Sequence, residues 1–215
     1  MPSERQALNV AVIPSVSGGL GHISRTLKLA RALHDADPSL HICYVLSERF
    51  LRPFNVDVVR GTGFPVRMLP DPTRQERDQI VNEVLGDIDV VIEDTERRLI
   101  AYRPLLPRLS AWISVPMLPL WDELFMDWPL LDHADHILYT LPPELPVAEE
   151  IARFRDKMTV TGPILDEHAF PERRAARRRL GLADGDTLIT YAPRGFPFGP
   201  DFGMTVLDAV VGAFI

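Results

Sequence analysis

The chain has 215 residues, 46% hydrophobic and 25% charged, which indicates a soluble globular protein with enough apolar side chains for one full core. Its formal net charge of −7 disfavours a nucleic-acid-binding protein, because neutralising phosphates requires clustered Lys and Arg. The single cysteine, Cys43, excludes an internal disulfide and fits a reducing, cytoplasmic location. The sequence shows no secretory signal and no apolar run of the ~20 residues that a membrane-spanning helix needs.

Short apolar runs alternate with segments of helical period, which predicts an α/β fold: a Rossmann-like, doubly wound parallel sheet with helices on its faces. The first strand is expected at 8–14 and the following helix at 20–34, where Ile23, Leu27, Ala30 and Leu33 form one apolar stripe. Later strands are expected at 41–46, at either 56–60 or 66–69, and at 88–92, 111–115 and 136–139. Further helices are expected at 75–85 and from about 95 to 109.

A domain boundary is expected near Gly162 and Pro163, because 161–171 has two prolines and little periodicity. The predicted parts are an N-terminal domain over 1–161, a linker over 162–171 and the beginning of a second Rossmann-like domain over 172–215. In the last part we expect a helix over 172–180 ended by Gly181, a strand over 187–192 and a helix from 204 onward. About 45 residues are too few for a second core, so this domain is expected to be truncated; a short extension packed on the first domain is the alternative.

The loop after the first strand carries the strongest functional signal. Gly18, Gly19 and Gly21 allow positive φ angles and let a ligand approach the backbone closely. The next helix offers unpaired N–H groups at its start, at the sheet edge where open α/β folds bind ligands. His22 falls in the first turn of that helix, and an imidazole there can act as a general base.

Asp94 follows the strand expected at 88–92. In the common doubly wound strand order the fourth strand lies beside the first, which predicts that Asp94 is a neighbour of His22. A carboxylate there can fix the tautomer of the imidazole and stabilise its protonated form. The structural alternative, in which Asp94 caps the next helix, stays open.

The loop and the start of the helix read Gly18-Gly19-Leu20-Gly21-His22-Ile23-Ser24-Arg25-Thr26-Leu27. This run resembles the opening motif of GT-B glycosyltransferases, in particular the family 28 or MurG-like group. A second segment, Val160-Thr161-Gly162-Pro163-Ile164, resembles the stretch that leads those enzymes into their C-terminal domain. The resemblance extends over the whole chain, and these two segments are its distinctive parts.

The resemblance implies metal-independent transfer of a sugar, with inversion, from a nucleotide-diphosphate-sugar to an acceptor hydroxyl. The nucleotide sugar is then a co-substrate, no cofactor is expected, and the acceptor is a small molecule or a lipid-linked one. His22 is expected to be the catalytic base with Asp94 as its partner. Expected acceptor contacts are Ser17, Gly18, Gly19, Gly21 and Arg25. Expected donor contacts are Arg194, Gly195 and Phe196, although their loop lacks the small-residue turn of the family, and the 215 residues alone are expected to be inactive.

Two other functions remain open. Residues 19–24 nearly match G-x-G-x-x-G, and Glu48 stands where a ribose-binding acid belongs, so an NAD(P)-binding oxidoreductase is one alternative. Ser24 in place of the third glycine and the bulk of His22 count against it. A non-catalytic acceptor-binding half, which needs a separate donor-binding subunit, is the other.

Three weaker signals carry no assignment of their own. Trp121, Leu124, Phe125 and Trp128 have the spacing of an apolar helix stripe, which fits a core-facing helix, an acceptor groove or a peripheral membrane contact. Segment 132–136 matches no zinc signature and is interpreted as a solvated turn, so no metal site is expected. The arginines of 173–179 are interpreted as a solvated helix face, with a phosphate contact as the alternative.

Overall fold

The computed structural model describes residues 7–16, 20–48, 51, 53–70, 76–116, 128–140, 142, 144, 152–164, 172–183 and 185–188. The chain divides into two compact units, residues 1–165 and 166–215. In the described part of the second unit, the regular element is the helix α5 (Arg173–Arg179), which ends just before Gly181 at a φ of +71°. The helix expected at 172–180 is therefore present, with glycine in the left-handed conformation that ends many helices.

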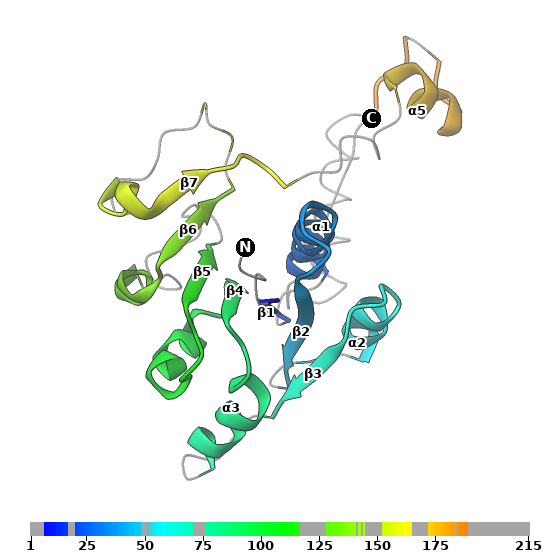
Figure 1. The fold of residues 1–215 in the computed structure, drawn as a ribbon. Helices are drawn as coiled ribbons and strands as arrows, with labels where there is room; N and C mark the ends of the chain where they lie inside the picture. The colour runs from blue at the N-terminus through cyan, green and yellow to red at the C-terminus, as the bar shows by residue number, and fades with distance from the viewer. Residues whose placement is uncertain are drawn as a thin grey trace, which may run out of the picture. The chain divides into compact units, whose positions relative to one another are not determined.

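The described part of the first unit is built on a seven-stranded sheet in the order β3-β2-β1-β4-β5-β6-β7, with every neighbouring pair parallel (Figure 1). The strands are β1 (Asn9–Pro14), β2 (His41–Ser47), β3 (Val66–Leu69), β4 (Val90–Asp94), β5 (Ala111–Val115), β6 (His136–Tyr139) and β7 (Met158–Val160). The chain proceeds outward from β1 to β3, returns to the centre and proceeds the other way from β4. The strand order therefore reverses between β1 and β4, which confirms the predicted α/β doubly wound fold.

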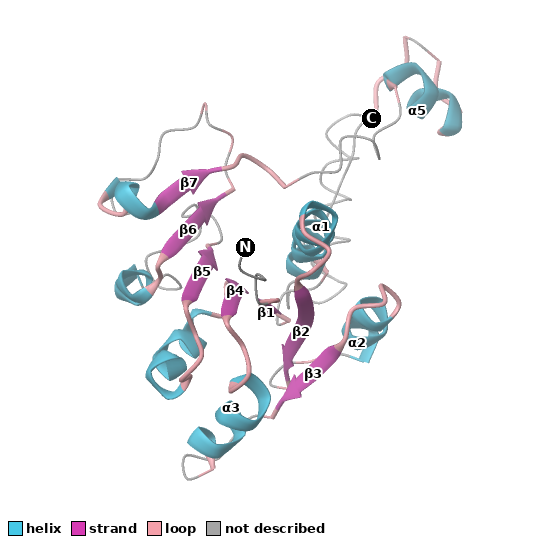
Figure 2. Ribbon diagram, viewed as in Figure 1, coloured by secondary structure: helices cyan, strands magenta, loops and turns pink. Residues whose placement is uncertain are grey.

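Helices and 3₁₀ helices connect the strands (Figure 2). They are α1 (Gly21–Ala36), α2 (Pro53–Arg60), α3 (Arg77–Leu85) and the 3₁₀ helices η1 (Arg97–Leu105), η3 (Trp128–His133) and η4 (Arg155–Lys157). The predicted apolar stripe of α1 is confirmed, since Ile23, Leu27 and Ala30 are buried. No helix among the described residues combines the length and the apolar character needed to cross a membrane.

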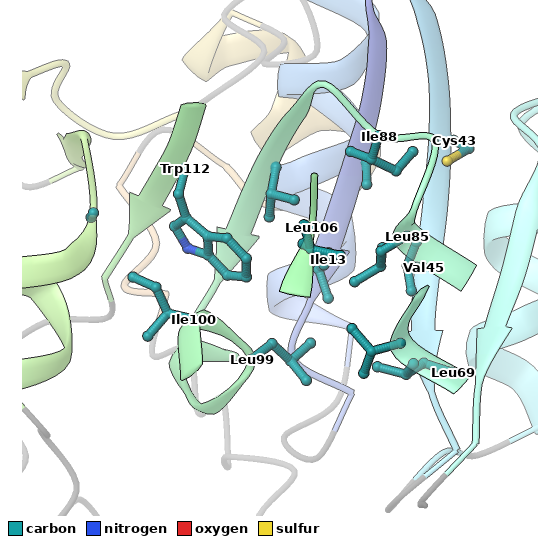
Figure 3. Close-up of a cluster of buried hydrophobic side chains, with 14 of the residues drawn as sticks. Ile13, Cys43, Val45, Leu69, Leu85, Ile88, Leu99, Ile100, Leu106 and Trp112 are labelled. Atoms are coloured by element: carbon teal, nitrogen blue, oxygen red, sulfur yellow. The ribbon is translucent and has the colours of Figure 1, made fainter. Parts of the chain in front are cut away.

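Alternate residues of the central strands supply two separate cores, as the period of a strand requires. Val10 and Val12 of β1 pack on one face with the buried side chains of α1 and α2. Ala11 and Ile13 pack on the other face with α3 and η1. Figure 3 shows Ile13 and Trp112 among the side chains of this second cluster. Both faces of the central strands are thus covered, and the carboxyl ends of the strands form the edge that can bind a ligand.

The strand expected at 88–92 is β4 at Val90–Asp94, so Asp94 ends the strand and does not follow it. Three other elements decide between, or differ from, the sequence-based expectations. Segment 56–60 belongs to helix α2, so the alternative strand at 66–69 is the correct one. Pro53 suits the first position of a helix, and Asn55 and Val59, four residues apart, form its buried side. The helix expected at about 95–109 is the shorter 3₁₀ helix η1, which contains Pro104 and therefore lacks an N–H group near its end. Strand β7 has three residues, too few for a recognisable alternation, and was not expected.

Candidate functional site

The candidate site lies at the carboxyl edge of the sheet, where β1 and β4 are neighbours. Their register pairs Pro14 with Asp94, the last residue of each strand. One residue further along, the Ser15 backbone N–H donates to the Asp94 carbonyl oxygen at 2.8 Å. Because α1 begins at Gly21, this pairing brings the first turn of α1 to the end of β4.

His22 and Asp94 are in direct contact. The imidazole Nδ1 lies 2.8 Å from Asp94 Oδ1, and the side chain of Asp94 is fully buried while that of His22 is 14% exposed. An ionised carboxylate only accepts hydrogen bonds, so Nδ1 carries the proton and donates it, and Nε2 of the neutral ring is left as an acceptor. The expected proximity of the two residues is confirmed by this contact.

Arg25 binds the same carboxylate from the next turn of α1. Its Nε donates to Asp94 Oδ2 at 2.8 Å, and its Nη2 donates to Asp94 Oδ1. The guanidinium also reaches the hydroxyl of Thr140, just beyond β6, through Nη1 at 3.4 Å. Arg25 was expected to bind substrate; in the structure two of its nitrogens are committed to Asp94, and its side chain remains 21% exposed.

The contacts fix the charge of Asp94. Burial alone would raise the pKa of this carboxyl, but the hydrogen bonds from His22 and Arg25, together with the positive charge of Arg25, outweigh burial. The pKa of Asp94 is therefore lowered from its ordinary value, and the side chain is a carboxylate at neutral pH.

Thr95 completes the cluster and was not expected from the sequence. Its hydroxyl donates to Asp94 Oδ1 at 3.0 Å. Among the described residues it is the non-glycine residue with positive φ, at +67°. For a β-branched side chain this left-handed backbone is strained, and such strain often accompanies functional sites.

The structural alternative for Asp94 is wrong. The residue at the N-cap position of η1 is Glu96, not Asp94. The Asp94 carboxylate instead contacts His22, Arg25 and Thr95. Asp94 therefore joins β4 to α1 and does not serve as a helix cap.

The backbone at the start of α1 is not covered at Gly21. A Cβ added to Gly21 would meet no atom within 4 Å. Leu20, which precedes the helix, has no polar side chain to cap it and is 43% exposed. The remaining predicted contacts, Ser17, Gly18 and Gly19 for the acceptor and Arg194, Gly195 and Phe196 for the donor, lie outside the described residues.

Two further buried polar residues near this edge were missed by sequence reasoning. Asn55 is fully buried, and its Nδ2 donates to the carbonyl oxygen of Val16, just ahead of the glycine loop, at 3.3 Å. Glu93 is fully buried on the opposite face from Asp94, where the Ser114 hydroxyl donates to its Oε1 at 2.5 Å. A rule that marks polar residues at every strand end would have found Glu93 and Thr140, but not Asn55, which lies within a helix.

Where the structure describes the residues of the three weaker sequence signals, their side chains make contacts within the fold. Segment 132–136 is more than a solvated turn, because Asp135 accepts the Trp112 backbone N–H at 2.7 Å and pairs with Arg103 at 2.8 Å. The described residues contain no group of three His, Cys, Asp or Glu side chains that could hold a metal ion. In α5, Arg177 donates to the carbonyl oxygens of Ala183 and Asp186, so it closes the turn after its own helix. The predicted stripe at 121–128 falls on residues whose side chains lie outside the description.

Glu48, on which the oxidoreductase alternative depends, is exposed just after β2. Its position at the carboxyl edge agrees with that alternative. However, the start of α1 holds His22 and Arg25 against Asp94, where a dinucleotide fold would place the pyrophosphate.

Comparisons with known proteins gave distant structural likenesses. Neither the family models nor the curated proteins contain a match to this sequence. The crystal structure of LpCGTa in complex with UDP is 17% identical with a TM-score of 0.47, covering 74% of this chain and 51% of that one. The structure of a ugt transferase from Siraitia grosvenorii in complex with UDP is 13% identical with a TM-score of 0.45, covering 80% and 52%.

A third structure, the FMN-dependent cysteine decarboxylase TvaF from thioviridamide biosynthesis, is 13% identical with a TM-score of 0.34, covering 60% of this chain and 84% of that one. The present chain spans about half the length of the first two structures. At these identities and TM-scores the likenesses do not establish a function.

Proposed function

We propose that this chain is the acceptor-binding part of a GT-B glycosyltransferase of the family 28 or MurG-like group. The observation that carries the proposal is the 2.8 Å contact between His22 Nδ1 and Asp94 Oδ1 at the reversal point of the sheet. The glycine motif places that imidazole at the start of a helix, beside open space at Gly21. The His22–Asp94 contact and the glycine motif together support a base at the sheet edge where a doubly wound fold binds its ligand.

In the proposed reaction, His22 Nε2 accepts the proton of an acceptor hydroxyl. The hydroxyl oxygen attacks the anomeric carbon as the bond from that carbon to the nucleoside diphosphate breaks, and in-line displacement inverts the configuration. Proton transfer converts the imidazole to imidazolium, which the Asp94 carboxylate stabilises through Nδ1. The electron pair of the broken bond leaves with the diphosphate, so no oxidant and no metal ion is needed.

The remaining parts of the proposal concern the partners. The donor is a nucleotide-diphosphate-sugar bound by the second domain, with Arg194, Gly195 and Phe196 at its diphosphate. The acceptor is a small molecule or a lipid-linked one, which Ser17, Gly18, Gly19 and Gly21 contact. We place the enzyme in the cytoplasm, with peripheral membrane contact where the acceptor is lipid-linked.

The experiment uses the whole protein that carries this chain. It is incubated with UDP-, GDP- and dTDP-sugars and a mixture of alcohol acceptors, and the release of nucleoside diphosphate and the glycosylated product are measured by mass spectrometry. Acceptor-dependent product in the wild type, strongly reduced in His22→Ala, supports the proposal. Tight NADH binding without sugar transfer from any donor would overturn it in favour of the oxidoreductase.

A further inference from the structure

The carboxylate that contacts the His22 imidazole also binds the guanidinium of Arg25. Asp94 Oδ1 accepts hydrogen bonds from His22 Nδ1, from Arg25 Nη2 and from the Thr95 hydroxyl, while Oδ2 accepts one from Arg25 Nε. The guanidinium thus holds the carboxylate at both oxygens, a geometry in which Arg binds more strongly and more specifically than Lys can. The Asp94 side chain is fully buried, so water screens this pair weakly.

The spacing in α1 explains why both residues reach the same carboxylate. His22 and Arg25 are three residues apart on one helix, and residues with this spacing lie on the same face. Arg25 Nη2 lies 3.4 Å from His22 Nδ1. Because both nitrogens donate to Asp94, no hydrogen bond joins them to each other, and a protonated imidazole would place a second positive charge beside the guanidinium.

This arrangement changes what Asp94 does for the base. A carboxylate alone favours the imidazolium form of a neighbouring histidine. Arg25 is always charged and already neutralises Asp94, so the imidazole faces a paired carboxylate and a cation. In the described part of the site the charged groups recorded around the imidazole are Asp94 at the end of β4 and Arg25 on α1. The hydroxyls of Thr95 and of Thr140, beyond β6, are neutral.

We propose that Arg25 is a positioning residue that acts through Asp94. Its guanidinium fixes the carboxylate for His22 and opposes protonation of the imidazole, so that Nε2 stays available to accept a proton. The catalytic consequence rests on the proposed function, whereas the coupling between Arg25 and His22 is a property of the chain alone and can be measured without substrate.

The first test is an NMR titration of the His22 imidazole in the 215-residue chain, with its signals assigned by comparison with His22→Gln. In Arg25→Gln the midpoint is expected to move to higher pH by about one unit, because the opposing cation is lost while Asp94 remains. Arg25→Lys is expected to move it in the same direction by less, since a flexible, hydrated ammonium holds Asp94 at one point. Arg31→Gln removes the same charge from an exposed position of α1 and is expected to leave the midpoint in place.

An unchanged or lower midpoint in folded Arg25→Gln overturns the inference. If that variant does not fold, as judged by circular dichroism, Arg25→Lys is judged by the same criterion: an upward shift supports the coupling and its absence overturns it. A role of Arg25 limited to stability would change the unfolding transition of these variants but not the midpoint of the imidazole in the folded protein.

The second test uses the transferase activity of the whole protein. The acid limb of the kcat/KM profile is expected to move to higher pH in Arg25→Gln by the same amount as the NMR midpoint, with the Arg31→Gln profile unchanged. An NMR shift in a protein with no transferase activity would leave the coupling standing and reject the proposed function. Activity that depends on His22, without any shift in Arg25→Gln, would reject the role of Arg25 and keep the function.

Discussion

His22 and Asp94 are 72 residues apart in the sequence, yet Nδ1 of one lies 2.8 Å from Oδ1 of the other. The parallel pairing of β1 with β4 produces this proximity, because it aligns Pro14 with Asp94 at the carboxyl edge. Helix α1 then needs only its first turn to carry the imidazole to the carboxylate. The pair therefore lies where two neighbouring central strands end, on regular elements of the fold that can hold a site in place.

Replacing the base tests the proposed mechanism directly. His22→Ala is expected to lower kcat of the whole enzyme by ~10²-fold or more with the KM for the nucleotide sugar little changed, since a general base contributes about that much and does not bind the donor. Steady-state kinetics with the donor varied at saturating acceptor measure both constants. His41→Ala, at the exposed start of β2, is the control. Turnover close to that of the wild type in His22→Ala would exclude the role of base.

Asp94→Asn is expected to lower the free energy of unfolding by about 3 kcal/mol at neutral pH, because it breaks a buried ion pair while keeping the shape of the side chain. The folded protein lowers the pKa of Asp94 below its ordinary value of 3.8. The stabilisation is therefore complete above that value and is lost as the pH falls through the lowered pKa of the native state.

Urea unfolding of both proteins at pH 7 and at about pH 3 checks this dependence. The difference between wild type and Asp94→Asn is expected to shrink at the lower pH. The exposed Asp57 of α2 provides the control, with a small difference expected for Asp57→Asn at either pH. A difference for Asp94→Asn that is equal at both pH values would contradict the ionised, paired state of this carboxylate.

Much of the sheet follows from hydrophobic pattern alone. The strands expected at 111–115 and 136–139 are found at those residues, because each is an apolar run bounded by polar or proline residues. The neighbourhood of His22 and Asp94 followed from the common strand order of doubly wound folds. Pattern could not decide between 56–60 and 66–69, since β-branched residues occur in both; burial of one face of a helix starting at Pro53 decided it.

The side-chain cluster was harder to predict than the strands. The two-point contact of Arg25 depends on the rotamer of a long side chain, which sequence spacing does not determine. Thr140 and Thr95 are common residue types at loop positions, and nothing in the local sequence marks the positive φ of Thr95. These contacts depend on tertiary packing, and for that reason Arg25 was assigned to the substrate and not to Asp94.

The strained backbone at Thr95 gives a prediction that separates conformation from hydrogen bonding. Thr95→Gly and Thr95→Ala both remove the hydroxyl that donates to Asp94. At a φ of +67° glycine is unstrained while alanine is not, so Thr95→Gly is expected to be more stable than Thr95→Ala by about 1 kcal/mol. Chemical denaturation of the two variants measures the difference. Equal stabilities, or a more stable alanine variant, would show that this backbone relaxes without cost.

Lys157 offers a test of the fold away from the candidate site. Its ammonium donates to the carbonyl oxygens of Leu131 at 2.7 Å, Asp132 at 2.9 Å and Ala134 at 2.8 Å, at the end of η3. Burial lowers the pKa of Lys157, and the charges of Asp132 and Asp135 oppose that shift. The three carbonyl groups lie at the end of a 3₁₀ helix, where the last carbonyl groups lack donors within the helix. Of the three, Leu131 also accepts the Ala134 backbone N–H at 3.1 Å.

Lys157→Met keeps the length of the side chain and removes the ammonium that donates to these carbonyl groups, so the free energy of unfolding is expected to fall by about 1–3 kcal/mol. Lys28→Met in α1 removes the same charge from a position with no recorded carbonyl contact and is expected to change stability by less than about 0.5 kcal/mol. Thermal and urea unfolding of the two variants provide the comparison. If both variants lose equal stability, the loss reflects net charge, and the three hydrogen bonds of Lys157 do not hold the end of η3 beside β7.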